Sequence, residues 1–365
     1  MTEITDWNEE ELHSVASCTV GLTDFGDNWY LPGLRDEIEK FAKLELTDSG
    51  RRWFFRRIVD TLIARLYSEK GWASNPQVLS LSIRRPVVII GLPRTGTTAL
   101  HRLLASDSQF QGLQYWLARR PMIRPPRDTW AQLPEYRACE NYIRTTFTSE
   151  FQKMHAVRAD ELEECDDIIY QGFPTNPECV LRAYSRYANV LRLIGGHDHD
   201  KTWLLKAPCH MINIEALLGV FPDAYIIHIH RDPLESLNSW CNLVYLQRQM
   251  LEGESLPLGT IGPAECSYWR KAIDQVQSCR ANSEWHFFDL DQRQLLTQPL
   301  EAVRSVYRYC GLELSELTER KMRALIASWS GPIPSSRKRA TAEFGISENY
   351  IRDMFSGYRK DHGYD

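Results

Sequence analysis

A glycine-containing loop is the first segment whose residue types and spacing suit chemistry. Residues 91–98 read GLPRTGTT, with the glycine spacing of the phosphate loop G-x-x-x-x-G-K-[ST], but Thr97 stands where that motif has its lysine. Backbone N–H groups that open a helix can still bind one dianionic group. Because the lysine that balances a β/γ-phosphate pair is missing, the loop favours a nucleotide with a single 5′-phosphate over a magnesium triphosphate.

A second anion-binding pattern is HRDPLESLNSW at residues 230–240. Arg231 leaves an apolar run, and Ser236 and Ser239 lie in the helix that Pro233 can begin. A P-loop NTPase would have an aspartate at the end of this run to organise magnesium, whereas this chain has an arginine. Two anion sites at one sheet edge indicate a ligand phosphorylated at two places. A third basic run, SSRKR at 335–339, could close over the same ligand, or form an exposed loop.

These segments need a parallel sheet to position them. The β-branched run before Gly91 predicts a buried strand, and three further strand candidates alternate with helical patterns that begin near His210, Pro233 and Pro263. The three candidates are WLLKA, AYIIHIH and WHFFDL, at residues 203–207, 224–230 and 285–290. Alternation of strand and helix predicts an α/β fold with a doubly wound, P-loop-type parallel sheet flanked by helices.

The loops after Ile90, Lys206 and His230 should then meet beyond the carboxyl ends of the strands, where such sheets bind ligands. Their meeting would bring the phosphate loop and Arg231 into one crevice.

The rest of the chain has helical patterns. Residues 53–67 place one apolar stripe on a helix, with Arg56, Arg57 and Arg65 off it, which is typical of a core-packing helix. The stretch ARRPMIRPPRDTW reads as an extended loop, and residues 133–195 are helix-like with breaks near 172–177. We expect a helical N-terminal segment over 1–82 and a P-loop α/β domain over 83–365, with a helical cap at about 115–200.

Composition excludes several classes of protein. The 365 residues include 43 Lys and Arg against 48 Asp and Glu, and the net charge of −5 gives no general attraction to nucleic acid or anionic lipid. We expect no export signal and no membrane span, because the start is acidic and the apolar runs are short. Nine scattered cysteines without a CxxC pair fit a reducing cytoplasm and no structural zinc site.

Two histidine-containing segments resemble metal ligands. HDHD at 197–200 follows two glycines and reads as a polar turn. His228 and His230 alternate on one face of a predicted buried strand, where hydrogen-bonded core histidines are the more frequent case. We assign no metal.

Several segments together resemble the P-loop sulfotransferases that use 3′-phosphoadenosine 5′-phosphosulfate, in particular a bacterial branch related to tyrosylprotein sulfotransferases. The similarity spans nearly the whole chain, in GLTDFGDNWYLPGL, VIIGLPRTGTTALHRLLA, WLLKAPCHM, VFPDAYIIHIHRDPLESLNS and EFGISENYIRDMFSGY. The combination of GLPRTGTT with HRDP and a downstream serine is specific. The resemblance implies transfer of a sulfuryl group to a hydroxyl or amine, with adenosine 3′,5′-bisphosphate as product and no metal.

The resemblance also implies donor-binding residues. Arg231 and Ser239 should bind the 3′-phosphate. Relatives often have His-x-Tyr before the EFG-like segment, where this chain has basic residues, and we assign Arg337 and Arg339 to the donor as well. The 5′-phosphosulfate should lie on the loop residues Arg94, Thr95, Gly96, Thr97 and Thr98.

Catalysis should rest on positioning and on cations, because sulfuryl transfer resembles phosphoryl transfer. Arg94 and Lys206 are the candidates, and Lys206 follows an apolar strand as the catalytic lysine of the related enzymes does. His210 matches a family histidine and should lie near the acceptor or the donor.

The general base is assigned by resemblance. Family members often carry Trp-Glu after the second strand, where this chain has Trp116 and Leu117. The segment KMHAVRADELEEC resembles the family's His- and Glu-containing segment, so His155 is the first candidate, Glu164 the second and Asp160 the third, the last also as an acceptor contact. A surface or capping role is the alternative for each.

Two other functions stay open at this point. A nucleotide-dependent kinase of related fold would need magnesium and ATP, which Thr97 and Arg231 disfavour. A nucleotide-binding protein that has lost its chemistry would bind the bisphosphate without turnover. The acceptor is expected to be a small molecule, apolar or ring-bearing from the aromatics of residues 130–170, and neither its identity nor the oligomeric state follows from the sequence.

Overall fold

The computed structural model describes residues 7–147, 149, 152, 156–253, 256–281, 285–329 and 339–364. The chain divides into two compact units, described separately here. Unit 1 comprises Met1–Ile83, Leu113–Asp200 and Arg248–Leu256, and unit 2 comprises Arg84–Gly112, Lys201–Gln247 and Pro257–Asp365. None of the described helices combines the length and apolar character needed to cross a lipid bilayer.

Unit 2 contains a five-stranded parallel sheet in the order β2-β3-β1-β4-β5. The strands are β1 (Val87–Gly91), β2 (Phe110–Gly112), β3 (Thr202–Lys206), β4 (Tyr225–His230) and β5 (His286–Asp291). The predicted α/β fold with a P-loop-type parallel sheet is therefore confirmed. The short β2 was not among the strand candidates, because its three residues, FQG, form no apolar run.

The sheet order decides where a ligand can bind. β1 lies in the centre, with β3 on one side and β4 on the other, and Ile89 is level with Lys206 and with Ile227. The chain builds one half of the sheet with β2 and β3 and then the other half with β4 and β5. The carboxyl end of β1 is thus the point at which such sheets open a ligand crevice.

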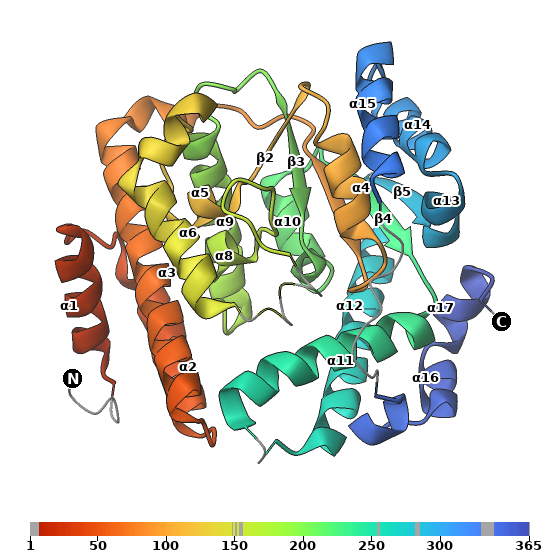
Figure 1. The fold of residues 1–365 in the computed structure, drawn as a ribbon, viewed down its shortest axis with the longest axis horizontal. Helices are drawn as coiled ribbons and strands as arrows, with labels where there is room; N and C mark the ends of the chain where they lie inside the picture. Colours follow the sequence, from red (N-terminus) through yellow and green to blue (C-terminus); the bar gives the residue numbers. More distant parts are fainter. Residues whose placement is uncertain are drawn as a thin grey trace. The chain divides into compact units, whose positions relative to one another are not determined.

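Helices cover the sheet of unit 2. One apolar core joins the strands to α4, α13, α14 and α15 through residues such as Leu103, Leu295 and Val306, and Figure 1 shows these helices grouped beside the sheet. In chain order, these and the other helices in this part of the chain are α4 (Thr97–Leu104), α10 (Ile214–Val220), α11 (Pro233–Glu252), α12 (Ile261–Ala281), α13 (Gln292–Thr297), α14 (Pro299–Cys310), α15 (Glu316–Ala327), α16 (Glu348–Met354) and α17 (Ser356–Asp361).

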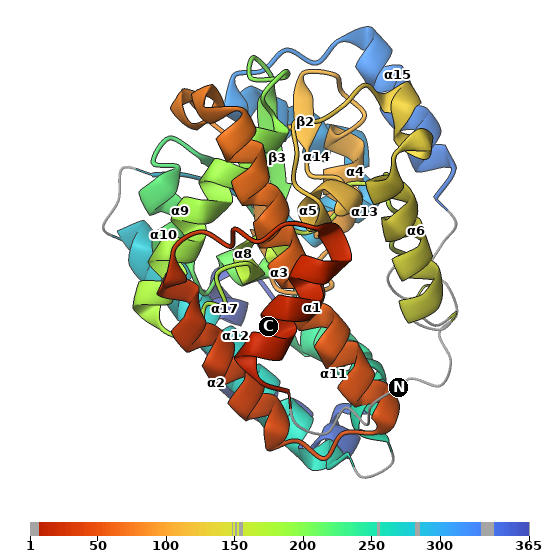
Figure 2. The same ribbon diagram turned by 90° about the vertical axis from the view of Figure 1, so that its left-hand side faces the viewer.

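The described part of unit 1 is helical. Its helices are α1 (Glu9–Val20), α2 (Leu31–Ala42), α3 (Asp48–Ser74), α5 (Tyr115–Arg119), α6 (Pro134–Thr146), α8 (Asp166–Tyr170) and α9 (Pro177–Ile194). The predicted apolar stripe of α3, with Phe54, Ile58 and Leu62 in it, packs against α1 and α2, and Figure 2 shows α1 lying along α3.

One detail of the α3 prediction is wrong. Arg65 was placed off the buried face, yet its side chain is fully buried. Its guanidinium donates to the carbonyl oxygens of Phe25 at 2.8 Å and Gln171 at 2.8 Å and lies 3.7 Å from the centre of the Tyr30 ring. Backbone carbonyls and an aromatic face replace the water that the cation loses, so periodicity alone could not place it.

Candidate functional site

The phosphate loop joins β1 to α4 in a conformation that exposes its cation. Arg94 has φ +67° and Gly96 has φ +92°, so both lie in the left-handed region. A glycine takes that conformation without strain, which explains Gly96 directly before the first turn of α4. Thr95 and Thr97 are buried, whereas Arg94 and Thr98 are exposed.

Buried hydroxyl groups fasten this loop. Thr95 Oγ1 donates to the Leu92 carbonyl oxygen at 2.7 Å, and Ser236 Oγ on α11 donates to the Pro93 carbonyl oxygen at 2.6 Å. Both side chains are fully buried. The loop is therefore held from within and from α11.

We predict that Ser236→Ala lowers the free energy of unfolding by about 1–2 kcal/mol, because it leaves the buried Pro93 carbonyl without its donor. Loosening of the loop should also weaken binding of adenosine 3′,5′-bisphosphate about tenfold. Chemical denaturation and calorimetric titration measure the two effects. Ser305→Ala is the matched control, since Ser305 Oγ bonds the Glu301 carbonyl within α14, at 3.0 Å. Equal bisphosphate affinity in Ser236→Ala and the control would contradict the assigned role.

Three of the predicted donor residues come together. Arg94 Nε donates to Ser239 Oγ at 3.3 Å, and Arg231 Nη1 donates to the Arg94 carbonyl oxygen at 2.6 Å. Loss of hydration, and then the neighbouring Arg231 cation, lower the pKa of the Arg94 guanidinium from its ordinary value. Two cations held side by side against their mutual repulsion create a positive potential, which an anionic ligand would relieve.

The guanidinium of Arg231 also contacts a carboxylate that sequence reasoning did not single out. Glu235, exposed in the first turn of α11, accepts from Arg231 Nε at 3.1 Å and Nη2 at 2.8 Å. An incoming phosphate must share the guanidinium with this carboxylate or displace it. The available signal was the four-residue spacing from Arg231, which precedes α11 by two residues.

We predict that Glu235→Gln tightens binding of adenosine 3′,5′-bisphosphate by up to about fivefold, because removing an exposed ion pair frees Arg231 at small cost. Isothermal titration calorimetry at low salt is the measurement. Glu348→Gln, which removes the exposed pair with Arg352 on α16, is the control. Weaker binding in Glu235→Gln would mean that the carboxylate orients Arg231 rather than competing for it.

Lys206 and His210 lie at the end of β3 and just beyond it. Lys206 is the last residue of the strand and its side chain is 1% exposed. His210 ends a single 3-10 turn, Pro208–His210, and is fully buried. Burial lowers the pKa of His210 to about 3, so its imidazole is neutral at physiological pH. Both residues are in unit 2 with the phosphate loop.

The C-terminal segment of unit 2 holds the residues on both sides of Arg231. The Tyr358 hydroxyl and His230 Nδ1 share a hydrogen bond of 2.8 Å. Arg359, 4% exposed, pairs with Asp232 and donates to the Tyr364 carbonyl oxygen. These contacts fix the turn that carries Arg231, and no local pattern in the sequence indicated them.

Of the two predicted basic residues near the C-terminus, Arg339 lies in the described part of the chain. Arg337 lies outside the described residues. Arg339 donates to the Glu343 carboxylate at 2.8 Å and to the Tyr245 hydroxyl at 3.1 Å, and its backbone bonds Asn242 of α11. Its guanidinium is thus held along α11, the helix that begins beside Arg231.

The predicted base candidates belong to unit 1. His155 lies outside the described residues. Glu164 is half-buried just before α8, and Asp160 accepts a hydrogen bond from Arg127 at 2.7 Å. Leu117, at the position of the family glutamate, is fully buried.

Unit 1 contains a polar cluster that sequence reasoning missed. Arg119 and Arg120 were expected in an extended loop, but α5 ends at Arg119, and Asp60 of α3 accepts from Arg119 at 2.7 Å and Arg120 at 3.0 Å. Burial raises the pKa of Asp60, but the two guanidinium groups outweigh it and hold that pKa below its ordinary value. A pocket of about 320 Å³ adjoins the cluster, lined by Phe55, Arg56, Val59, Asp60, Ile63, Arg120 and Tyr142, among others.

Comparisons with known proteins agree on one family. A model described as "Sulfotransferase family" matches residues 86–316. The omega-hydroxy-beta-dihydromenaquinone-9 sulfotransferase Stf3 of Mycobacterium tuberculosis is 22% identical over 306 residues, covering 77% of this chain and 75% of that protein. Among solved structures, sulfotransferase STF1 of Mycobacterium tuberculosis has a TM-score of 0.81 at 29% identity, covering 97% of this chain and 100% of its own. Sulfotransferase STF9 of Mycobacterium avium has a TM-score of 0.85 at 24% identity, covering 99% and 97%.

Proposed function

The chain belongs to the sulfotransferase family, and from that premise we propose that its donor is 3′-phosphoadenosine 5′-phosphosulfate and its acceptor a hydroxyl group of a small apolar molecule. The observation that carries the donor proposal is the convergence of Arg94, Arg231 and Ser239 beside the phosphate loop. A loop without the P-loop lysine suits one 5′-phosphate, and Arg231 with Ser239 suits a second phosphate on the same nucleotide.

The proposed reaction is an in-line displacement at sulfur. The acceptor oxygen forms a bond to the sulfur of the donor while the bond from that sulfur to the bridging 5′-phosphate oxygen breaks. The sulfuryl group moves to the acceptor, adenosine 3′,5′-bisphosphate leaves, and the acceptor proton passes to a base. Arg94 and Lys206 would neutralise charge that develops on the bridging and equatorial oxygens.

His155 stays our first proposed base and Glu164 the second, because a neutral imidazole can accept a proton at physiological pH. Asp160 is the third candidate, and its carboxylate is already paired with Arg127. His210 is proposed to contact acceptor or donor as a neutral imidazole.

The acceptor proposal rests on two observations. The relative Stf3 is described as acting on an omega-hydroxy menaquinone, a ring-bearing and apolar alcohol. The unit 1 pocket has an apolar wall of Phe55, Val59 and Ile63 together with polar groups, as expected where an apolar molecule bears a hydroxyl. We also propose a cytoplasmic protein, because none of the nine cysteines, all of which lie among the described residues, forms a disulfide.

The test is a transfer assay with the purified chain, the phosphosulfate donor and a panel of acceptors: hydroxylated polyprenyl quinones, simple phenols and aryl amines. We expect release of adenosine 3′,5′-bisphosphate together with a sulfated quinone alcohol, detected by mass spectrometry. Product from aryl amines alone would overturn the proposed acceptor class. Absence of any product with intact bisphosphate binding would favour a protein that has lost its chemistry.

A further inference from the structure

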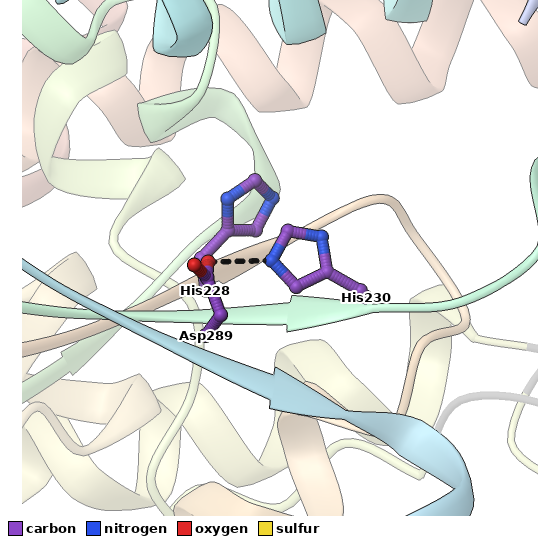
Figure 3. A group of neighbouring side chains, drawn as sticks. All are labelled: His228, His230 and Asp289. Atoms are coloured by element: carbon purple, nitrogen blue, oxygen red, sulfur yellow. Dashed lines mark hydrogen bonds and ion pairs between the residues drawn. The ribbon is translucent and has the colours of Figure 1, made fainter. Parts of the chain in front are cut away.

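Three potential metal ligands gather on one side of the neighbouring strands β4 and β5. His228, His230 and Asp289 each offer a ligand atom, and these atoms all lie within 4.8 Å of one another. Figure 3 shows the two imidazoles and the carboxylate grouped over the two strands. His228 and Asp289 are directly level in the strand register, and His230 shares the face of His228 because strand side chains alternate.

Of these three residues, His228 is the one whose buried ring nitrogens have no hydrogen-bond partner among the described residues. Its side chain is 3% exposed, and neither ring nitrogen has a hydrogen-bond partner in the part of the chain that the structure describes. One of its ring nitrogens lies in the same group of ligand atoms as His230 and Asp289. A buried polar group of this kind requires a partner that the described residues do not supply.

The other two proposed ligands, His230 and Asp289, have hydrogen-bond partners that fix the directions of their side chains. His230 Nε2 points at Asp289 Oδ1, 2.7 Å away, while its Nδ1 is held by the Tyr358 hydroxyl at 2.8 Å. Arg280 donates to both Asp289 oxygens, at 2.5 and 3.1 Å. Metal-bound histidines and carboxylates have such second partners, which fix their direction.

We propose that His228, His230 and Asp289 form a site for a zinc ion. Zinc bound by nitrogen and oxygen at about 2.0–2.2 Å in a tetrahedron needs ligand atoms about 3.4 Å apart, a small rearrangement of the present group. Two imidazoles and one carboxylate suit this metal. Asp289 has a side chain 49% exposed, so the fourth position opens to solvent and supplies an entry path.

Binding needs no loss of the Arg280 pair. For zinc to bind both Asp289 and His230 Nε2, the His230 proton must lie on Nδ1, from which it donates a hydrogen bond to the Tyr358 oxygen. A carboxylate has about four lone-pair sites, so two bonds from Arg280 and one to zinc fit together. The proposed transfer reaction needs no step through this site.

The experiment titrates zinc alone into the purified, tag-free chain against a chromophoric chelator, with Co²⁺ absorption to report four-coordinate geometry. We expect one equivalent in the wild type and in the control His286→Ala, an exposed histidine at the start of the same β5 strand. His228→Leu and Asp289→Asn should weaken binding at least 100-fold, and Tyr358→Phe 10- to 100-fold.

Two results would overturn the site: less than one equivalent bound by the wild type, or equal affinity in Asp289→Asn and the wild type. Asp289→Asn keeps the proposal falsifiable if His228→Leu does not fold, because Asp289 is half-exposed and its replacement is isosteric.

Discussion

Replacing Lys206 by methionine should lower kcat for sulfuryl transfer by about 10²–10³-fold, which corresponds to the loss of one preorganised charge-stabilising group. Lys206 is 1% exposed at the carboxyl end of β3, level with Ile89 of the strand that leads into the phosphate loop. An ammonium group kept from water acts more strongly on charge that develops in the transition state than an exposed one does. Methionine preserves the length and apolar stem of the side chain.

The measurement is pre-steady-state transfer with saturating donor, together with the Kd of adenosine 3′,5′-bisphosphate. Lys201→Met, at the opposite end of the β3 segment, is the control and should keep the wild-type rate. A Lys206→Met enzyme with unchanged kcat would show that the lysine is structural. A loss of bisphosphate affinity as large as the loss of rate would make Lys206 a ground-state contact instead.

Replacing Arg231 by alanine should raise the Kd of adenosine 3′,5′-bisphosphate about 100-fold and leave the Kd of adenosine 5′-phosphate nearly unchanged. The reason is that a bidentate guanidinium–phosphate contact contributes about 3 kcal/mol, and only the first nucleotide has a 3′-phosphate. Arg231 is 23% exposed at the side chain and is aimed by its bond to the Arg94 carbonyl.

Arg231→Lys and Arg352→Ala complete this series. Lysine keeps the positive charge but cannot donate two parallel hydrogen bonds as a guanidinium does, so we expect Arg231→Lys to lose an intermediate amount of bisphosphate affinity. Arg352 forms an exposed pair on α16, and its loss should leave both affinities as they are. If Arg231→Ala weakened both nucleotides equally, the arginine would be acting on the loop and not on a 3′-phosphate.

The sheet was predictable because β1 is a continuous apolar run and β4 is rich in isoleucine around His228. The β-branched residues of Val87 to Ile90, and Ile226, Ile227 and Ile229, are buried on both faces, which is typical of a parallel sheet. Three residues of β2 have no such run, and the short strand is defined by its pairing with β3 alone. The buried Arg65 was misplaced because its partners are backbone carbonyls from distant segments.

In the candidate site, the sequence predicted the positions only of residues that directly follow neighbouring parallel strands. The loop, Arg231 and Ser239 lie on segments that parallel strands bring together, so their meeting followed from the fold. Tyr358 and Arg359 hold the same turn from more than a hundred residues away, and nothing local in the sequence indicates that contact. The base candidates come from resemblance, and the identity of the base stays a prediction.

The most direct test of the account is calorimetric titration of the wild-type chain with adenosine 3′,5′-bisphosphate, run beside ATP with and without magnesium. We predict tight binding of the bisphosphate that is unchanged by chelation of magnesium, and much weaker binding of ATP under both conditions. Preferential, magnesium-dependent binding of ATP would contradict the proposed donor site.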